Sequence, residues 1–212
     1  MRGSRSRLVF VPLVRGAQGV ACPHTCGVVE TMQVVTTVCA IAAGVGAVLL
    51  IVARLLAGHW PLAARWGAAV ASARPVLTLI VAAGSMLGSL YFSERAHYIP
   101  CRLCWFQRIA MYPIALVALV ALIRRDRGAR WYILPMATIG ALISTWHYLV
   151  EWHPTWEGTS CSLFGPACSD IWFRTWGFST LAFMALCGFV SIIVFNTVTF
   201  HRTPASDEQE QT

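Results

Sequence analysis

The stretch YIPCRLCWFQRIAMYP, residues 98–113, places two cysteines in a CxxC spacing at the start of an apolar sequence. Two intervening residues let the sulfurs of Cys101 and Cys104 close a small disulfide ring, and a helix N-terminus stabilises a thiolate. Arg108, four residues after Cys104, falls on the same face of a helix. Zinc knuckles share the CxxC spacing, but an arginine one turn deeper at a membrane surface favours redox chemistry, and we expect no metal here.

The composition of the chain is that of an integral membrane protein. Of its 212 residues 57% are hydrophobic and only 12% are charged, and the mean hydropathy is +0.64. These values lie beyond those of a soluble domain. The net charge is +7, but the basic residues stand in short loops between apolar runs, as the positive-inside rule describes. We therefore expect no nucleic-acid partner.

Uncharged runs predict five membrane-spanning helices. A hydrocarbon core of about 30 Å requires about 20 helical residues, and four runs are long enough: 31–53, 75–93, 131–150 and 175–201. Between Arg108 and Arg124 lie only 15 uncharged residues, so this fifth span must extend back towards Cys104. Arg108 is thereby predicted inside the membrane, where a guanidinium must snorkel or find a polar partner.

The loops predict the orientation. The segment RRDRGAR, residues 124–130, holds four arginines and is expected to stay in the cytoplasm. The loop over residues 151–171 contains three acidic residues and no Lys or Arg, so we expect it outside. This loop carries Cys161 and Cys168, and the CxxC lies at the same end of the predicted spans. Four cysteines are thus expected at the extracytoplasmic face, in a compartment where disulfides persist.

The predicted fold is an all-α polytopic membrane protein, a four-helix transmembrane bundle with one extra N-terminal transmembrane helix. Its predicted parts are an irregular N-terminal segment (1–30), the extra helix (31–56), a cytoplasmic connection (57–74), the bundle (75–200) and a disordered cytoplasmic tail (201–212). This topology puts an arginine-bearing N-terminus outside, against the positive-inside rule. Either the run 31–53 is a less regular element, the interior charges dominate the orientation, or translation starts at Met32 and not at Met1.

The remaining cysteines are expected to have no redox role. Cys22 and Cys26 have CxxxC spacing without a second pair of metal ligands nearby. Cys39 and Cys187 fall within apolar spans, where a thiol behaves as a small hydrophobic side chain.

Two further features leave alternatives open. His147 lies just inside an aromatic belt at the end of the fourth span, where it either contacts a ligand near Arg108 or hydrogen-bonds a loop. Cys161 and Cys168 are separated by six residues that include Gly165 and Pro166. This turn chemistry lets the two sulfurs approach, for either a redox pair or a structural disulfide.

Four motifs carry a resemblance to a known family. They are CRLCWFQRIAMYP, the helix end WHYLVE, the two-cysteine outer loop, and WGFSTLAFMAL at the start of the last helix. Together they resemble the DsbB/BdbC family of membrane disulfide bond formation proteins over about residues 75–200. The loop pair is as closely spaced as in the BdbC branch, and the N-terminal span has no counterpart in the basic four-helix form.

The resemblance implies a function and roles for six residues. The family reoxidises a secreted DsbA-like, thioredoxin-fold thiol oxidase and passes the electrons to a membrane quinone, menaquinone or ubiquinone. By this resemblance Cys101 and Cys104 are the quinone-linked pair, and Cys161 and Cys168 are the pair that exchanges with the partner. Arg108 would support the quinone, and His147 resembles a histidine near the same site.

Two other classes of function remain open at this stage. A membrane thiol reductase could run the same cysteines in reverse and export electrons. A non-enzymatic membrane protein could carry the outer disulfides for structure alone. Reduction of a quinone by a reduced thiol partner would favour the oxidase over both.

Overall fold

The computed structural model describes residues 25–57, 60–126, 128–157 and 166–198. This part of the chain is helical, and its helices run in the order α1 (Thr25–Leu56), α2 (Pro61–Ser72), α3 (Arg74–Glu94), α4 (Arg102–Arg124), α5 (Arg130–Trp152), the 3-10 helix η1 (Pro154–Trp156) and α6 (Leu181–Thr197). Within these ranges the structure contains no β-sheet, and the only strand-like pairing is one isolated bridge. The predicted all-α membrane fold is confirmed.

Four of the helices have the length and composition to cross a membrane: α1, α3, α4 and α5. The apolar helix α6 is shorter, at 17 residues. The predicted start of the last span, at residue 175, is wrong. Thr175 and Ser179 pair across a tight turn in which Trp176 and Gly177 have φ angles of 52° and 79°. Thr180 then caps α6 by accepting a hydrogen bond from the amide of Phe183 at 3.3 Å.

The N-terminal boundaries also differ from the prediction. Helix α1 begins at Thr25, six residues before the predicted span, and continues through Leu56. The connection predicted over 57–74 contains the helix α2, with Pro61 in its first turn, where proline is well tolerated. The rest of the predicted segment 1–30, with Cys22, and the predicted tail 201–212 lie outside the described residues.

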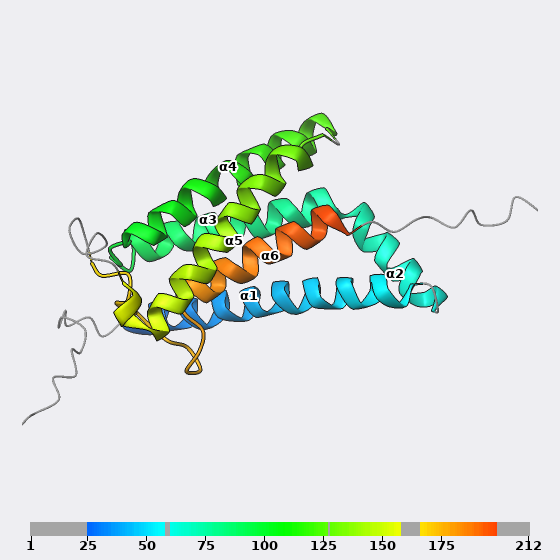
Figure 1. Cartoon of the computed structure of the whole chain (residues 1–212). Coiled ribbons are helices and arrows are strands. Elements are labelled where there is room, and N and C mark those ends of the chain that lie inside the picture. Colours follow the sequence, from blue (N-terminus) through cyan, green and yellow to red (C-terminus); the bar gives the residue numbers. More distant parts are fainter. Residues whose placement is uncertain (1–24, 58–59, 127, 158–165, 199–212) are drawn as a thin grey trace, which may run out of the picture.

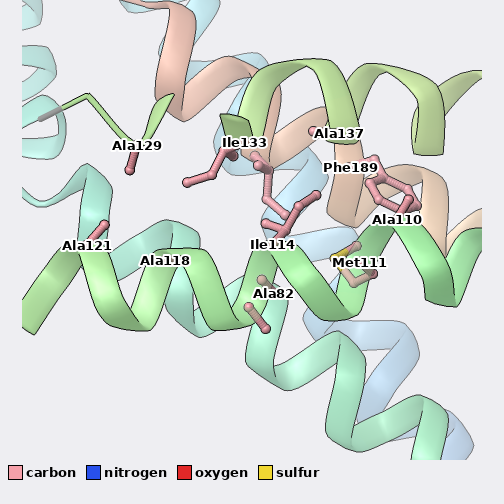
Figure 2. Packing of buried hydrophobic residues seen from close by; sticks show 12 residues of the cluster. Ala82, Ala110, Met111, Ile114, Ala118, Ala121, Ala129, Ile133, Ala137 and Phe189 are labelled. Atoms are coloured by element: carbon pink, nitrogen blue, oxygen red, sulfur yellow. The ribbon is translucent and has the colours of Figure 1, made fainter. Parts of the chain in front are cut away.

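Helix α6 lies at the centre of the bundle and packs against α5, α1 and α3 (Figure 1). The main core joins α3, α4, α5 and α6 around Ile114, Ala137 and Phe189, all fully buried (Figure 2). The contact between α5 and α6 is close because Gly140 has no side chain. A Cβ atom there would stand 2.3 Å from the Phe189 ring, so small residues allow these helices to approach, as in many membrane bundles.

Among the described residues, the CxxC lies at one end of the bundle and six of the ten arginines lie at the other. The CxxC lies at the start of α4, whose 23 residues span about 34 Å, and the arginine-rich turn follows at its far end. The end of α1, helix α2 and the start of α3 lie at that same far end, at the right in Figure 1. They bring Arg54, Arg65 and Arg74 to the side of the bundle that carries Arg124 and Arg130.

Candidate functional site

Cys101 is the residue that starts α4. It has an extended backbone (φ −70°, ψ 173°), and its Sγ accepts a hydrogen bond from the Cys104 amide at 3.3 Å. The Cys101 Sγ also donates to the Cys104 Sγ at 3.0 Å. This hydrogen bond, together with burial, raises the pKa of the Cys101 thiol. Of the two sulfurs, Cys101 therefore holds its proton, and Cys104 accepts a hydrogen bond at the positive end of a helix dipole.

Cys168 lies beside this pair. Its side chain is fully buried in a cluster with Cys101 and Val150, and Cys104 packs against the same cluster. The structure thus brings three of the four predicted catalytic cysteines together. Cys161 lies outside the described residues.

The Glu157 carboxylate anchors the Cys168 segment. It accepts a hydrogen bond from the Cys168 amide at 2.5 Å and one from the Ser169 amide at 3.2 Å, and the Ser169 hydroxyl donates to it as well. Three donors on one carboxylate fix the backbone of the loop at the position where Cys168 meets the CxxC.

His147 reaches the thiols from α5. Its ring is 3% exposed, and its Nε2 lies 3.6 Å from the Cys101 Sγ and 3.1 Å from the Cys168 carbonyl oxygen. Its Nδ1 is 3.2 Å from the Gln107 side-chain nitrogen. One ring therefore contacts both cysteine-bearing segments, and one of the two alternatives left open by the sequence, a hydrogen bond to a loop, is present.

Glu151 stands one turn after His147 and is also buried. Its Oε1 is 3.9 Å from the His147 Nε2, and its Oε2 accepts a hydrogen bond from the Thr180 hydroxyl at 2.6 Å. Because Thr180 caps α6, a continuous polar chain runs from Cys101 through His147 and Glu151 to the start of the central helix.

Arg108 lies on the side of α4 that faces α3, and its polar partners are on α3. Its guanidinium donates to the Ser89 carbonyl oxygen at 3.2 Å and to the Ser93 hydroxyl. It also lies over the Trp105 ring, 5.3 Å from the centroid. The partners expected for an arginine inside the membrane are thus a carbonyl, a hydroxyl and an aromatic ring.

A cavity of about 380 Å³ opens beside Arg108 between α1, α3, α4 and α6. Its walls are mostly apolar, and Cys104, Gln107 and Arg108 supply polar groups near one end. Pockets of this size and character hold flat organic ligands. His147 does not contribute to the described walls; it lines a second, small pocket with Cys101 and Glu151. Its predicted contact with a quinone stays a prediction.

Aromatic rings close the end of the cavity near the cysteines. Tyr98 stacks on Trp172, with ring centroids 4.9 Å apart, and on Phe92 at 5.7 Å. The Tyr98 hydroxyl accepts a hydrogen bond from the Gln33 side chain of α1 at 2.7 Å. Burial raises the pKa of the Tyr98 phenol, which keeps this contact uncharged.

The side chains around the CxxC also include three possible metal ligands. The ligand atoms of Cys101, Cys104 and His147 all lie within 4.8 Å of one another. A structural zinc site uses four ligands, so three side chains fall one short of a closed site.

These features define a class: a multi-pass membrane protein with clustered cysteines between a polar pocket and an apolar cavity. Residues 72–199 match the family of disulfide bond formation protein DsbB, so the chain belongs to that family. Membership supports a role in disulfide bond formation as a thiol:disulfide oxidoreductase. No solved structure gives a significant match.

Individual relatives are similar over about half of this chain. Disulfide bond formation protein C of Bacillus subtilis is 47% identical over 116 residues, which cover 55% of this chain and 84% of the relative. A probable disulfide formation protein C 1 of Bacillus anthracis is 41% identical over 108 residues, covering 51% and 78%. A probable disulfide formation protein of Oceanobacillus iheyensis is 41% identical over 114 residues, covering 53% and 78%.

Sequence reasoning missed four side chains of this site: Gln107, Glu151, Glu157 and Tyr98. A signal existed for Glu151, because residues four apart share a helix face and a buried carboxylate beside a histidine is a recurring arrangement. Glu157 and Tyr98 lie in loops, and nothing in their local sequence indicates what they contact.

Proposed function

We propose that the chain forms disulfides by reoxidising an extracytoplasmic thiol oxidase of the thioredoxin fold and passing the electrons to a membrane quinone. One observation carries the proposal. Cys104 lines both the polar pocket beside Cys101 and the large apolar cavity beside Arg108. A sulfur on this boundary can exchange with thiols on one side and meet an electron acceptor on the other.

In the first step, a thiolate of the reduced partner attacks the Cys161–Cys168 disulfide at Cys161. Burial of Cys168 supports this choice, because a protein partner cannot reach a fully covered sulfur. The Cys168 thiolate leaves, and the partner's second thiol resolves the mixed disulfide. The partner gains a disulfide, and the two loop cysteines take up two electrons and the protons.

In the second step, Cys168 attacks Cys101 of the oxidised CxxC, and the two residues are already packed together. Cys104 leaves as a thiolate on the side of the cavity, and Cys161 then closes the loop disulfide and frees Cys101. The raised pKa of Cys101 favours its return to the thiol form. His147 holds the Cys168 carbonyl and the Cys101 sulfur together during this exchange.

The cavity fits a quinone by its volume, its apolar walls and the position of its polar groups. When bound there, a quinone would accept two electrons and two protons and leave the CxxC oxidised. Arg108 and Gln107 would hold the head group, and Arg108 would stabilise the thiolate of Cys104 by its charge. Menaquinone and ubiquinone both meet these requirements.

The distribution of arginines supports an extracytoplasmic position for the end of the bundle that carries the CxxC, here called the redox end. Arg54, Arg65, Arg74 and the turn after α4 lie at the opposite end, which the positive-inside rule assigns to the cytoplasm. A cell membrane location, with α2 and the α4–α5 turn inside, agrees with this arrangement.

Trapping a mixed disulfide tests the thiol half of the proposal. A thioredoxin-fold oxidase whose resolving cysteine is replaced by alanine should accumulate a covalent complex joined at Cys161, mapped by peptide mass spectrometry. Adding the reduced oxidase to protein in lipid nanodiscs should reduce menaquinone, and Cys104→Ser should abolish this reduction. A complex joined at Cys22 or Cys26, or no quinone reduction with a thiol-competent partner, would refute the scheme.

A further inference from the structure

Helix α1 lies outside the region that matches the family, which begins at residue 72. It nevertheless packs along α6 and supplies one wall of the apolar cavity through Thr36, Cys39, Ala40 and Ala43. We propose that α1 builds a binding subsite for the polyprenyl chain of the quinone and thereby selects acceptors by their chain. This inference rests on the proposed function, because it concerns the same cavity.

The length of the cavity supports a chain as well as a head group. Phe92 and Ile80 both line it and stand twelve residues apart on α3, a separation of about 18 Å along a helix. Arg108, the one charged side chain among the described walls, lies with Cys104 and Gln107 towards the end next to the CxxC. Ser85, Ser89 and Tyr112 add uncharged hydroxyl groups along the wall. The inner part has no charged side chain among its described walls and lies deep in the apolar bundle. Isoprene units are apolar, so burial in this part of the cavity would stabilise them.

Small residues give this inner part its width. Ala40 and Ala43 of α1 and Gly84 and Gly88 of α3 all line the cavity. A Cβ added at Gly88 would lie 3.7 Å from the Thr36 methyl group, so this side chain of α1 reaches α3 at that level. Because glycine has no side chain, Gly84 and Gly88 leave room in this part of the cavity.

The N-terminal half of α1 is tied to the redox end by two polar contacts. Gln33 donates to the Tyr98 hydroxyl at 2.7 Å, and Thr37 accepts a hydrogen bond from the Ser179 hydroxyl at 3.3 Å. Thr37 is fully buried. These contacts hold α1 in register with the cavity, whereas its opposite face exposes valines to lipid, among them Val38 and Val45.

The test compares Ala43→Phe, which fills the inner cavity, with Val45→Phe, which adds the same ring on the lipid face. Equilibrium binding is measured by tryptophan fluorescence in nanodiscs with menaquinone-4, which has four isoprene units, and with menadione, which has none. Ala43→Phe should weaken menaquinone-4 binding about tenfold or more, the size expected when a filled cavity must be repacked. Menadione binding should change by less than about twofold, as should both ligands with Val45→Phe. Ala40→Phe serves as a second cavity variant if Ala43→Phe does not fold.

Cys39 provides an independent readout because it lines the same wall and its side chain is exposed. Saturating menaquinone-4 should slow its alkylation by N-ethylmaleimide at least severalfold, as followed by peptide mass spectrometry. Equal effects of Ala43→Phe and Val45→Phe, or unprotected Cys39 in a protein that binds menaquinone-4, would overturn the role of α1 and leave the proposed function standing. If the parent chain binds and reduces neither quinone, the proposed function fails and this inference fails with it.

Discussion

Cys101 and Cys104 differ in their surroundings although only two residues separate them. Cys101 caps α4 and faces His147 and Cys168, whereas Cys104 turns towards the cavity and Arg108. In the proposed function, this difference assigns Cys101 to exchange with the loop and Cys104 to the electron acceptor.

The protonation of Cys101 should show in its alkylation. Because its folded pKa is raised, Cys101 stays a thiol at pH values where an ordinary cysteine, with a pKa near 8.5, is already half thiolate. In the reduced protein, the rate of its reaction with iodoacetamide should therefore keep rising above pH 9. The same peptide in detergent-denatured protein is the control and should level off near pH 9. Equal profiles in the two states would contradict the raised pKa.

Arg108 should matter for electron transfer to the acceptor and not for exchange at the loop cysteines. Arg108→Lys keeps the charge but loses the planar group that donates to Ser89 and Ser93 and lies over Trp105. Hydrogen bonds to charged groups contribute about 1.5–3 kcal/mol. We expect quinone-dependent turnover to fall about tenfold or more, with unchanged formation of the mixed disulfide at the loop. A parallel loss in both half-reactions, measured by stopped flow and by trapping, would assign Arg108 to the fold instead.

Among the elements, the loop that precedes α6 is held in place by the Glu157 carboxylate. Glu157→Gln removes the charge and leaves a single oxygen for the three donors of Cys168 and Ser169. We expect the loop to open more often and Cys168 of the reduced protein to be alkylated about tenfold faster. Glu157→Asp, which keeps the charge on a shorter side chain, should have a smaller effect. Unchanged alkylation of Cys168 in Glu157→Gln would show that burial alone holds the loop.

The contact between α5 and α6 should tolerate no added methyl group. In Gly140→Ala the new Cβ would meet the fully buried Phe189 ring at 2.3 Å, so the helices must separate. Overpacking of this kind costs about 1–3 kcal/mol. The apparent Tm in detergent, followed by tryptophan fluorescence, should fall by several degrees. Gly46→Ala in α1, where nothing lies within 4 Å of the added atom, should leave the Tm unchanged or raise it slightly.

For the whole molecule, the topology can be tested in intact cells. A membrane-impermeant maleimide should label a cysteine introduced by Glu94→Cys, at the redox end, and should label Asp126→Cys only after the cells are permeabilised. Both positions are exposed and follow helices that run in opposite directions. Labelling of Asp126→Cys in intact cells would reverse the orientation and remove the CxxC from the oxidising compartment.

The sequence was sufficient for much of this architecture. Apolar runs located the helices because a bilayer imposes their length, and the CxxC followed by Arg108 could be placed on one helix by its periodicity. The start of α6 could not be found from charge alone, since residues 175–180 are uncharged like the helix that follows but form a turn instead. The anchoring of Cys168 by Glu157 and the wall that α1 gives to the cavity are tertiary contacts between segments distant in the chain, which local patterns do not encode.

The stacked rings of Tyr98 and Trp172 join the segment before α4 to the segment that carries Cys168. Both rings also border the cavity, so a movement of the outer loop changes the wall of the cavity. A molecule bound in the cavity that steadies these rings makes the loop harder to displace. By thermodynamic reciprocity, a docked protein that displaces the loop weakens the binding of that molecule by the same factor. In the proposed function, docking of the reduced partner therefore favours release of the reduced acceptor into the bilayer.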